Sequence, residues 1–209
     1  MPPPAAPTTP TFNPPPCPNC SAPRATLLGC AACGALFRND QADVFSLMGL
    51  PAQYTLDLPR LDAGYLAISR LAHPDRHVSK SDDAQELAEV VMAQANRARQ
   101  VLLDDRLRAE ALWQRLGGNG STPKKQPEPA FLMEVMELTE QLAGAGDSEK
   151  AALTDNIRAR LNAMRAELTQ QFAATPPPLT AIRDTLDRMA YWNRMLENAT
   201  GTGEHKLVH

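Results

Sequence analysis

Apolar residues recur at helical spacing along most of this chain. From about residue 41 to residue 116, Ala, Leu, Arg and Asp dominate, and the apolar–polar alternation of strands is missing. Three more helical segments follow, with breaks at AGAGD (143–147) and ATPPPL (174–179). Between the two parts, GGNGSTPKKQPEP (117–129) has the Gly, Pro and polar composition of a linker. The pattern predicts an all-α protein in two helical parts, without an internal repeat.

The first helical part should contain an antiparallel pair of helices. The first helix, from about residue 58 to 72, has one apolar stripe at about 100° per residue, made of Leu61, Tyr65, Ile68 and Ala72. The second, from about residue 82 to 103, turns a longer stripe inward, made of Leu87, Val91, Ala95, Ala98 and Leu102. Pro74 disfavours helical geometry at the residue before it. The tripeptide His73-Pro74-Asp75 is therefore expected on a loop at the tip of the pair.

The segment after the linker, PAFLMEVMELTEQLAGAG (129–146), has apolar residues on two opposite sides. Its inward stripe is predicted to be Phe131, Val135, Leu138 and Leu142. The other side has three apolar residues and two acidic neighbours, namely Leu132, Met133, Met136, Glu137 and Glu140. Flexible methionines in an exposed patch are typical of a protein-binding face. No Lys or Arg occurs between residues 126 and 149, so this face favours a basic partner.

Two further helices should complete a three-helix bundle. The middle helix has a core stripe of Leu153, Ile157, Leu161, Met164, Leu168 and Phe172. The last helix has a core stripe of Leu179, Ile182, Leu186, Met189 and Leu196. Tyr191 lies roughly opposite that second stripe, which suggests a contact anchor. The alternative is that the outward residues cover the first helical part or a dimer partner.

The four cysteines occur only as CPNC and CAACG, in the arrangement Cys17-x2-Cys20-x9-Cys30-x2-Cys33. Two residues between cysteines let both sulfurs face one point, and two such pairs supply the tetrahedral thiolate set that zinc prefers. The alternative, two disulfides or two redox pairs, lacks a secretory signal and a thioredoxin-like βαβ context. We therefore predict a structural zinc site that orders a segment with few apolar residues. All four positions would be filled by protein, leaving none for a substrate water.

Composition limits the classes of partner and location. Of 209 residues, 21 are Lys or Arg and 24 are Asp or Glu, and the net charge of -3 gives no general attraction to nucleic acid or anionic lipid. No apolar run is long enough for a transmembrane helix, so a soluble globular protein is expected. The first sixteen residues contain eight prolines and no charge, without the pattern of a secretory or transit signal. A cytoplasmic location is predicted, with the mitochondrial matrix as the alternative for a processed N-terminus.

The stretch RLAHPDRHVSK (70–80) allows several local interpretations. A catalytic His73–Asp75 pair would need a nucleophile or pocket that a two-helix tip does not offer. A metal site with His77 as third ligand has no standard ligand spacing across a proline. The tripeptide could also be an ordinary helix end, where His and Arg favour the dipole. The last interpretation is a docking loop that another protein recognises.

Several motifs together resemble the J-domain of the DnaJ class. They are DVFSLMGLP (43–51), a helix ending in LAHPDRH (71–77), and ANRARQVLLDDRLRAEALWQRLG (95–117). The opening motif, RAEAL and FLMEVMEL narrow the resemblance to HscB-type J-proteins of iron-sulfur cluster biogenesis. The resemblance covers residues 43 to about 197, and the cysteine pairs look like those in some longer members.

This resemblance implies a role for each surface. His73, Pro74 and Asp75 would trigger ATP hydrolysis by a DnaK-type, HscA-like chaperone, with Arg70 and Arg76 helping to dock it. The family's surface for the scaffold protein IscU would correspond to Leu132, Met133, Met136, Glu137, Glu140 and Tyr191. Three positions depart from the family pattern: Arg76 replaces the usual Lys, Ala72 replaces a common Tyr or Val, and Gly144 replaces an acidic residue.

The expected organisation runs from a Pro-rich tail to a scaffold-binding bundle. Its parts are a tail (1–16), a four-cysteine zinc module (17–38), a J-domain (41–117), a linker (118–129), a three-helix bundle (130–200) and a second tail (201–209). The predicted function is a co-chaperone that is not itself an enzyme, with self-association left open. The alternatives are a general J-domain protein with another client, a zinc-ribbon regulatory or nucleic-acid module, and an enzymatic metal site at His73 and His77.

Overall fold

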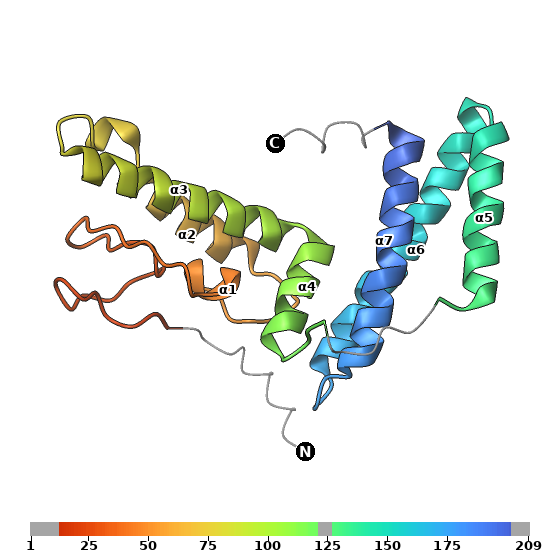
Figure 1. Cartoon of the computed structure of the whole chain (residues 1–209), viewed down its shortest axis with the longest axis horizontal. Coiled ribbons are helices and arrows are strands. Elements are labelled where there is room, and N and C mark those ends of the chain that lie inside the picture. The colour runs from red at the N-terminus through yellow and green to blue at the C-terminus, as the bar shows by residue number, and fades with distance from the viewer. Residues whose placement is uncertain (1–12, 121–126, 202–209) are drawn as a thin grey trace, which may run out of the picture. The chain divides into compact units, whose positions relative to one another are not determined.

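The computed structural model describes residues 13–120 and 127–201, in which the regular elements are helices and the cysteine-containing segment before α1 forms loops (Figure 1). The elements are α1 (Val44–Leu47), α2 (Leu58–Leu71), a 3-10 turn η1 (Pro74–Arg76), α3 (Asp82–Leu103), α4 (Asp105–Arg115), α5 (Pro129–Gly144), α6 (Asp147–Ala173) and α7 (Leu179–Thr200). Within those residues, an isolated bridge between Gly29 and Leu36 is the only β pairing. The predicted all-α fold is confirmed. Residues 1–12, 121–126 and 202–209, which include most of both predicted tails and half of the predicted linker, lie outside the described residues.

The chain divides into two compact units, whose boundary lies within α4 between Ala111 and Leu112. In the first unit, α2 and α3 pack against each other as the predicted pair. The α2 stripe buries Leu61 and Ile68, while Tyr65 at its edge is half-buried and donates its hydroxyl to Asn96 of α3. The inward residues of α3 are Ala88, Val91, Ala95, Ala98 and Leu102. Leu87, which was predicted to face inward, lies at the edge of that stripe and is half-buried. Ala88 is buried in its place.

The sequence pattern did not predict the two short helices α1 and α4 as separate elements. Asp43 begins the short α1 by accepting hydrogen bonds from two backbone N–H groups of its first turn. Asp104, the one extended residue between α3 and α4, does the same for α4. Arg108 of α4 is buried, and its guanidinium donates to the carbonyls of Tyr54 and Leu102. These hydrogen bonds fix the position of the start of α4 relative to the end of α3.

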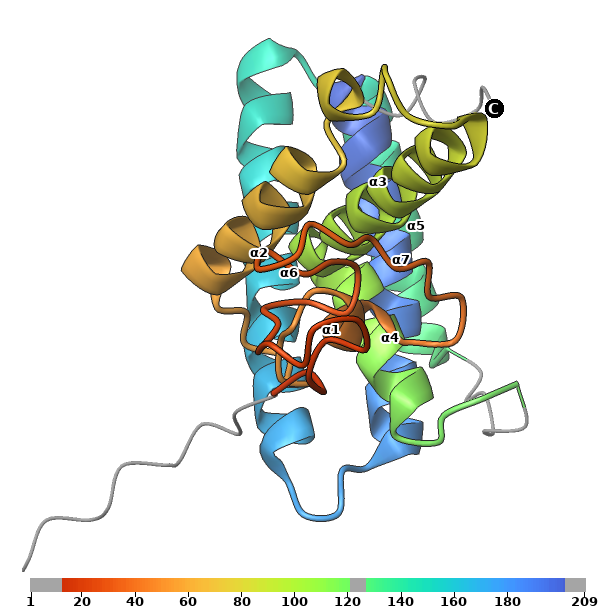
Figure 2. The same cartoon turned by 90° about the vertical axis from the view of Figure 1, so that its left-hand side faces the viewer.

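The cysteine-containing segment packs against the helices of the first unit, and its loops run beside α1 and α2 (Figure 2). Thr26 and Leu28 are buried, and Leu27 donates its backbone N–H to the carbonyl of Leu47 in α1. Gly49 has φ +70, and any side chain there would overlap the carbonyl oxygen of Ala25. The segment is therefore part of the same packed core as the helix pair.

The second unit contains a three-helix bundle of α5, α6 and α7. The buried residues of α6 include Ile157, Leu161, Met164 and Leu168, as predicted, while Leu153 and Phe172 are half-buried. Those of α7 are Ile182, Thr185, Leu186, Met189, Trp192 and Met195. The large Trp192 was missing from the predicted stripe, and it is fully buried with its ring edge-on to Phe131 of α5. The contact between the rings of Phe131 and Trp192 therefore packs α5 against α7.

Trp113, at the end of α4, belongs to the second unit. Its ring is buried, and its indole N–H donates to the carbonyl of Leu179 at 2.9 Å. The guanidinium of Arg183 lies over the same ring, 5.3 Å from its centroid. These contacts attach the end of α4 to the start of α7.

Candidate metal centre and binding surfaces

The four cysteine sulfurs gather into one cluster, with all four Sγ atoms within 4.8 Å of one another. The Sγ atoms of Cys17 and Cys33 are 3.7 Å apart, and so are those of Cys20 and Cys30. A tetrahedral ion with metal–sulfur bonds of about 2.3 Å separates its sulfurs by about 3.8 Å. A disulfide would need about 2.05 Å, and all four thiols are free. The donor set and spacing therefore fit a metal ion such as zinc.

The backbone forms each cysteine pair into the same kind of knuckle. Ser21 donates its N–H to the carbonyl of Cys17, and Gly34 donates its N–H to the carbonyl of Cys30, at 2.8 and 2.9 Å. Both donors have positive φ, 59° for Ser21 and 74° for Gly34. The left-handed residue turns the chain back so that the two sulfurs of a pair face one point.

The thiols of Cys20 and Cys30 differ in pKa. The backbone N–H of Cys33, followed by that of Ala32, stabilises the thiolate of Cys30 and lowers its pKa to about 7. A backbone hydrogen bond from Ala22 lowers the pKa of Cys20, but burial and the other three thiols outweigh it and raise that pKa to about 12. A bound cation would favour the thiolate form of all four cysteines.

The tripeptide His73-Pro74-Asp75 lies between α2 and α3, where η1 replaces the predicted open loop with one 3-10 turn. The turn is closed by hydrogen bonds from the N–H of Arg76 to the carbonyl of His73 and from the N–H of His77 to the carbonyl of Pro74. His73 accepts the N–H of Asp75 at its Nδ1, 3.3 Å away. All three side chains of the tripeptide are exposed, so the turn presents them to solvent.

The two basic residues predicted to assist docking have different surroundings. Both Arg70 and Arg76 are exposed. The guanidinium of Arg76 folds back and donates to the carbonyl of Arg70 at 3.2 Å. Ala72, where the family pattern has a larger residue, is buried at the end of α2. The side chain of Arg76 is thus partly occupied in ending the helix.

The structure does not assemble the two alternative sites at this tip. His77 is buried and its Nε2 lies 2.9 Å from the carbonyl oxygen of Leu71, so it does not converge with the exposed His73 and Asp75 on one ion. His73 Nδ1 and the Asp75 carboxylate are 3.6 Å apart with both side chains mostly in water. Among the described residues, the cysteine cluster is the only group of three or more potential ligands that converges.

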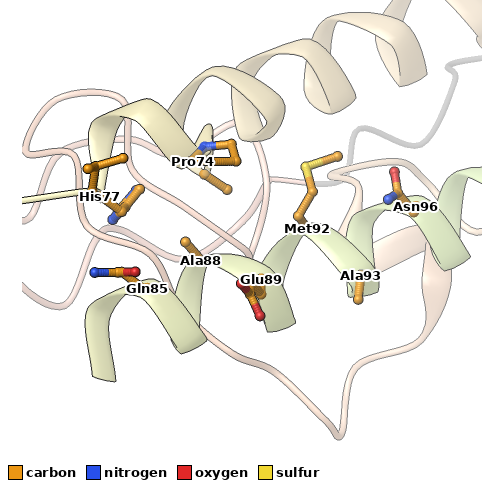
Figure 3. A pocket seen from close by; sticks show the side chains of 10 residues that line it. Pro74, His77, Gln85, Ala88, Glu89, Met92, Ala93 and Asn96 are labelled. Carbon is orange, nitrogen blue, oxygen red and sulfur yellow. The ribbon is translucent and has the colours of Figure 1, made fainter. Parts of the chain in front are cut away.

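A groove that the sequence did not indicate runs beside the tripeptide, between η1 and α3 (Figure 3). It has a volume of about 370 Å³. Pro74 and His77 line it from the turn, and small or flexible residues of α3 line it from the other side. Those α3 residues are Gln85, Ala88, Glu89, Met92, Ala93 and Asn96.

The outward face of α5 matches the predicted patch. Met133 and Met136 are 69% and 63% exposed, and Leu132 is also exposed. Glu137 and Glu140 are exposed beside them. Tyr191 of α7 is exposed as well, and its ring meets the edge of Phe131 with centroids 5.6 Å apart. The residues predicted from helical spacing therefore lie on the surface of the bundle, and Phe131 connects Tyr191 to α5.

A second groove of about 340 Å³ lies between α5 and α7 next to Tyr191. Val135 and Leu142, both predicted as core, are half-buried and line it. Arg194 and Lys150 add positive charge to this groove, which the acidic composition of α5 alone did not suggest. Gly144, at the end of α5, has open space around its Cα, so a longer side chain would fit there.

Comparisons with known proteins agree on one family. Residues 127–200 match the family model described as the HSCB C-terminal oligomerisation domain. The chain is 37% identical over 142 residues to the co-chaperone protein HscB homolog of Burkholderia mallei, which covers 68% of this chain and 77% of the relative. The human co-chaperone HscB has the same fold, with a TM-score of 0.75 and 24% identity over 90% of this chain and 98% of its own. The chaperone HscB from Vibrio cholerae matches with a TM-score of 0.66 and 27% identity, over 79% of this chain and all of its own.

Within the described residues, no helix combines the length and apolar character needed to cross a bilayer.

Proposed function

Because the chain belongs to the HscB family of co-chaperones, we propose that it binds an IscU-type iron-sulfur scaffold and delivers it to a DnaK-type, HscA-like chaperone. In the same complex it would stimulate the chaperone's ATPase. The observation that carries this proposal is the presence of two separate exposed surfaces, one on the turn between α2 and α3 and one on α5 with Tyr191. A carrier that hands a cargo to a second protein needs both.

The chaperone-binding surface would be His73, Pro74 and Asp75, with Arg70 as the basic neighbour. The turn holds the three side chains in water, where a partner can reach them without unfolding anything. Arg76 would keep its positive charge but offer fewer N–H donors to a partner, because its guanidinium already donates to the Arg70 carbonyl. The chemistry would take place in the chaperone, whose conformational equilibrium shifts because the co-chaperone binds one of its states more tightly.

The scaffold-binding surface would consist of Leu132, Met133, Met136, Glu137, Glu140 and Tyr191. Exposed methionines adapt their shape to a partner, and they lose contact with water when it binds. The two carboxylates at the edge would attract a basic partner and set its orientation. Tyr191 would supply the aromatic anchor that often dominates such interfaces.

The four thiolates of Cys17, Cys20, Cys30 and Cys33 would hold one zinc ion. With four protein ligands the ion supplies structural order and has no open position for a reaction. We place the protein in the cytoplasm and propose that it is not itself an enzyme. Neither nucleic acid nor a membrane belongs to this proposal.

Single-turnover ATP hydrolysis by the cognate chaperone tests the proposal. The wild type should accelerate hydrolysis, and adding the scaffold should accelerate it further, because cargo and turn then act on one chaperone. Asp75→Asn keeps the size of the side chain but removes its charge, and it should abolish the stimulation. Absence of stimulation by the folded wild type would contradict the proposal.

The second candidate, a J-domain protein with a different client, predicts a different result when scaffold binding is measured. Its scaffold binding would be absent or would survive the combined change Leu132→Ala, Met133→Ala and Tyr191→Ala. The favoured proposal requires that this triple variant lose scaffold binding while it still stimulates the chaperone without cargo.

A further inference from the structure

His77, two residues after the tripeptide, is buried in a segment that is otherwise exposed. Only 4% of its surface is accessible, whereas residues 73–76 and 78–80 are all exposed. A polar ring placed inside the fold at this point loses its contact with water. The proposed chaperone-binding role of the tripeptide does not by itself require such a residue.

The hydrogen bond of His77 determines which ring nitrogen carries the proton. Its Nε2 lies 2.9 Å from the carbonyl oxygen of Leu71, and a carbonyl only accepts. Nε2 is therefore the donor, and in the neutral ring Nδ1 carries no hydrogen. That Nδ1 is buried without a hydrogen-bond partner among the described residues. Only the bond through Nε2 compensates for the burial of this side chain.

The carbonyl that His77 reaches is at the end of α2. The last four carbonyls of a helix have no partner within it, and they need one from elsewhere. His77 supplies one for Leu71, and Arg76 supplies one for Arg70. Two consecutive residues thus bond back to two consecutive carbonyls, and the chain between them, with the tripeptide, becomes a closed loop.

His77 also borders the groove between the turn and α3. It lines the groove beside the turn together with Ala88 and Gln85, as Figure 3 shows. Ala88 is buried, and it lines this groove from the side of α3. One side chain therefore ties the residue after the turn to the end of α2 and faces the start of α3 across the groove.

We infer that His77 is a positioning residue, whose neutral, Nε2-protonated ring holds the tripeptide in the conformation that the chaperone binds. This inference rests on the proposed function. Without the bond, the turn would occupy its binding conformation for a smaller fraction of the time. The apparent affinity for the chaperone would fall by that fraction, while the complex, once formed, would be unchanged.

Titration of the chaperone's single-turnover ATPase with His77→Leu and His77→Gln tests this role. Leu fills the space without a donor, and Gln places an amide N–H the same number of bonds from the backbone. We expect His77→Leu to raise the concentration for half-maximal stimulation about tenfold, since a net hydrogen bond corresponds to about that factor. The maximal rate should stay at the wild-type value, and His77→Gln should recover most of the affinity. Asp75→Asn should instead give no stimulation at any concentration.

A matched control separates positioning from stability. Val91→Ala removes buried volume from α3 without touching the turn, and it should lower the melting temperature but leave the half-maximal concentration unchanged. The inference is wrong if His77→Leu titrates like the wild type, or if Val91→Ala weakens stimulation as much at equal loss of melting temperature.

The nitrogen NMR shifts of the His77 imidazole test the inference without the chaperone. They should report the neutral tautomer with the proton on Nε2, and a proton on Nδ1 instead would overturn the inference. If the folded wild type shows this tautomer but does not stimulate any chaperone, the proposed function fails while the hydrogen-bonded turn stands.

Discussion

The cysteine module and the three-helix bundle reach an ordered state by different means. Within residues 17–38 the fully buried side chains are few, namely Cys17, Thr26, Leu28 and Cys30. The bundle buries whole stripes of large residues, including Ile157, Leu161 and Trp192. A segment with so little buried apolar surface needs an added source of free energy to fold. The bundle buries enough apolar surface to fold while Met133 and Met136 stay exposed to water. The difference explains why the two regions should respond to different perturbations.

Metal removal should produce the largest effect, and only in the first unit. Structural zinc in small domains contributes about 10–16 kcal/mol of apparent binding free energy, so chelation or Cys30→Ser should unfold residues 17–38. Hydrogen exchange should then rise across those residues and remain low in α6 and α7. Acid should act in the same direction, because protonated thiols do not bind the ion. Purified protein without stoichiometric zinc, or a module that stays protected in chelator, would contradict this prediction.

Truncating the bundle core should have the next largest effect, and it should not depend on metal. Leu161 is almost fully buried, and Leu161→Ala should lower the free energy of unfolding by about 2–5 kcal/mol, through lost burial and the cavity left behind. Denaturant unfolding measures the change, with and without chelator. Ala166→Ser, at an exposed position of the same helix, is the control and should change little. A chelator-dependent loss in Leu161→Ala would mean that the two regions are not independent.

The bundle core was easier to predict from sequence than the turn and the loops. Residues at helical spacing, such as Leu161 and Leu186, follow from periodicity because one face of a long helix must be buried. Trp192 escaped that pattern, since its burial depends on Phe131 of another helix. The cysteine cluster was predictable because the spacing of its cysteines is local in the sequence.

The surroundings of the tripeptide could not be derived in the same way. The groove on α3 and the hydrogen bond from His77 to Leu71 depend on how two helices meet. Nothing in the letters RLAHPDRH distinguishes a buried His77 from the exposed His73. The hydrogen bond from Arg76 to the carbonyl of Arg70 likewise involves a backbone group, which sequence patterns do not reveal.

The outward face of α5 should separate binding from stability. The double change Met133→Ser and Met136→Ser should alter the free energy of unfolding by less than about 0.5 kcal/mol, as exposed substitutions usually do. It should weaken scaffold binding by at least about 1 kcal/mol, the level that marks an important interface residue. Calorimetric titration measures the affinity. Leu66→Ser, at a position of α2 that is 48% exposed, is the control and should bind normally; equal weakening would argue against a specific face.

The smallest effect should come from restoring charge at the end of α5. Gly144 has open space around it, and Gly144→Glu should tighten scaffold binding by about 0–1 kcal/mol, as exposed charge pairs do. The gain should fade as salt is added, because salt screens exposed charges. Gly144→Gln is the control for the change in helix propensity, and an equal gain in that variant would show that charge is not the cause.

The close approach of the cysteine segment to α2 has a consequence for anyone who shortens this protein. Gly29 lies against the side-chain ends of Ile68 and Leu71, so the segment acts as a cover for that side of α2. A chain that begins at residue 41, as a minimal J-domain would, uncovers these aliphatic groups. We expect such a fragment to self-associate and to precipitate, and a fragment that keeps residues 13–40 together with its metal to stay monodisperse.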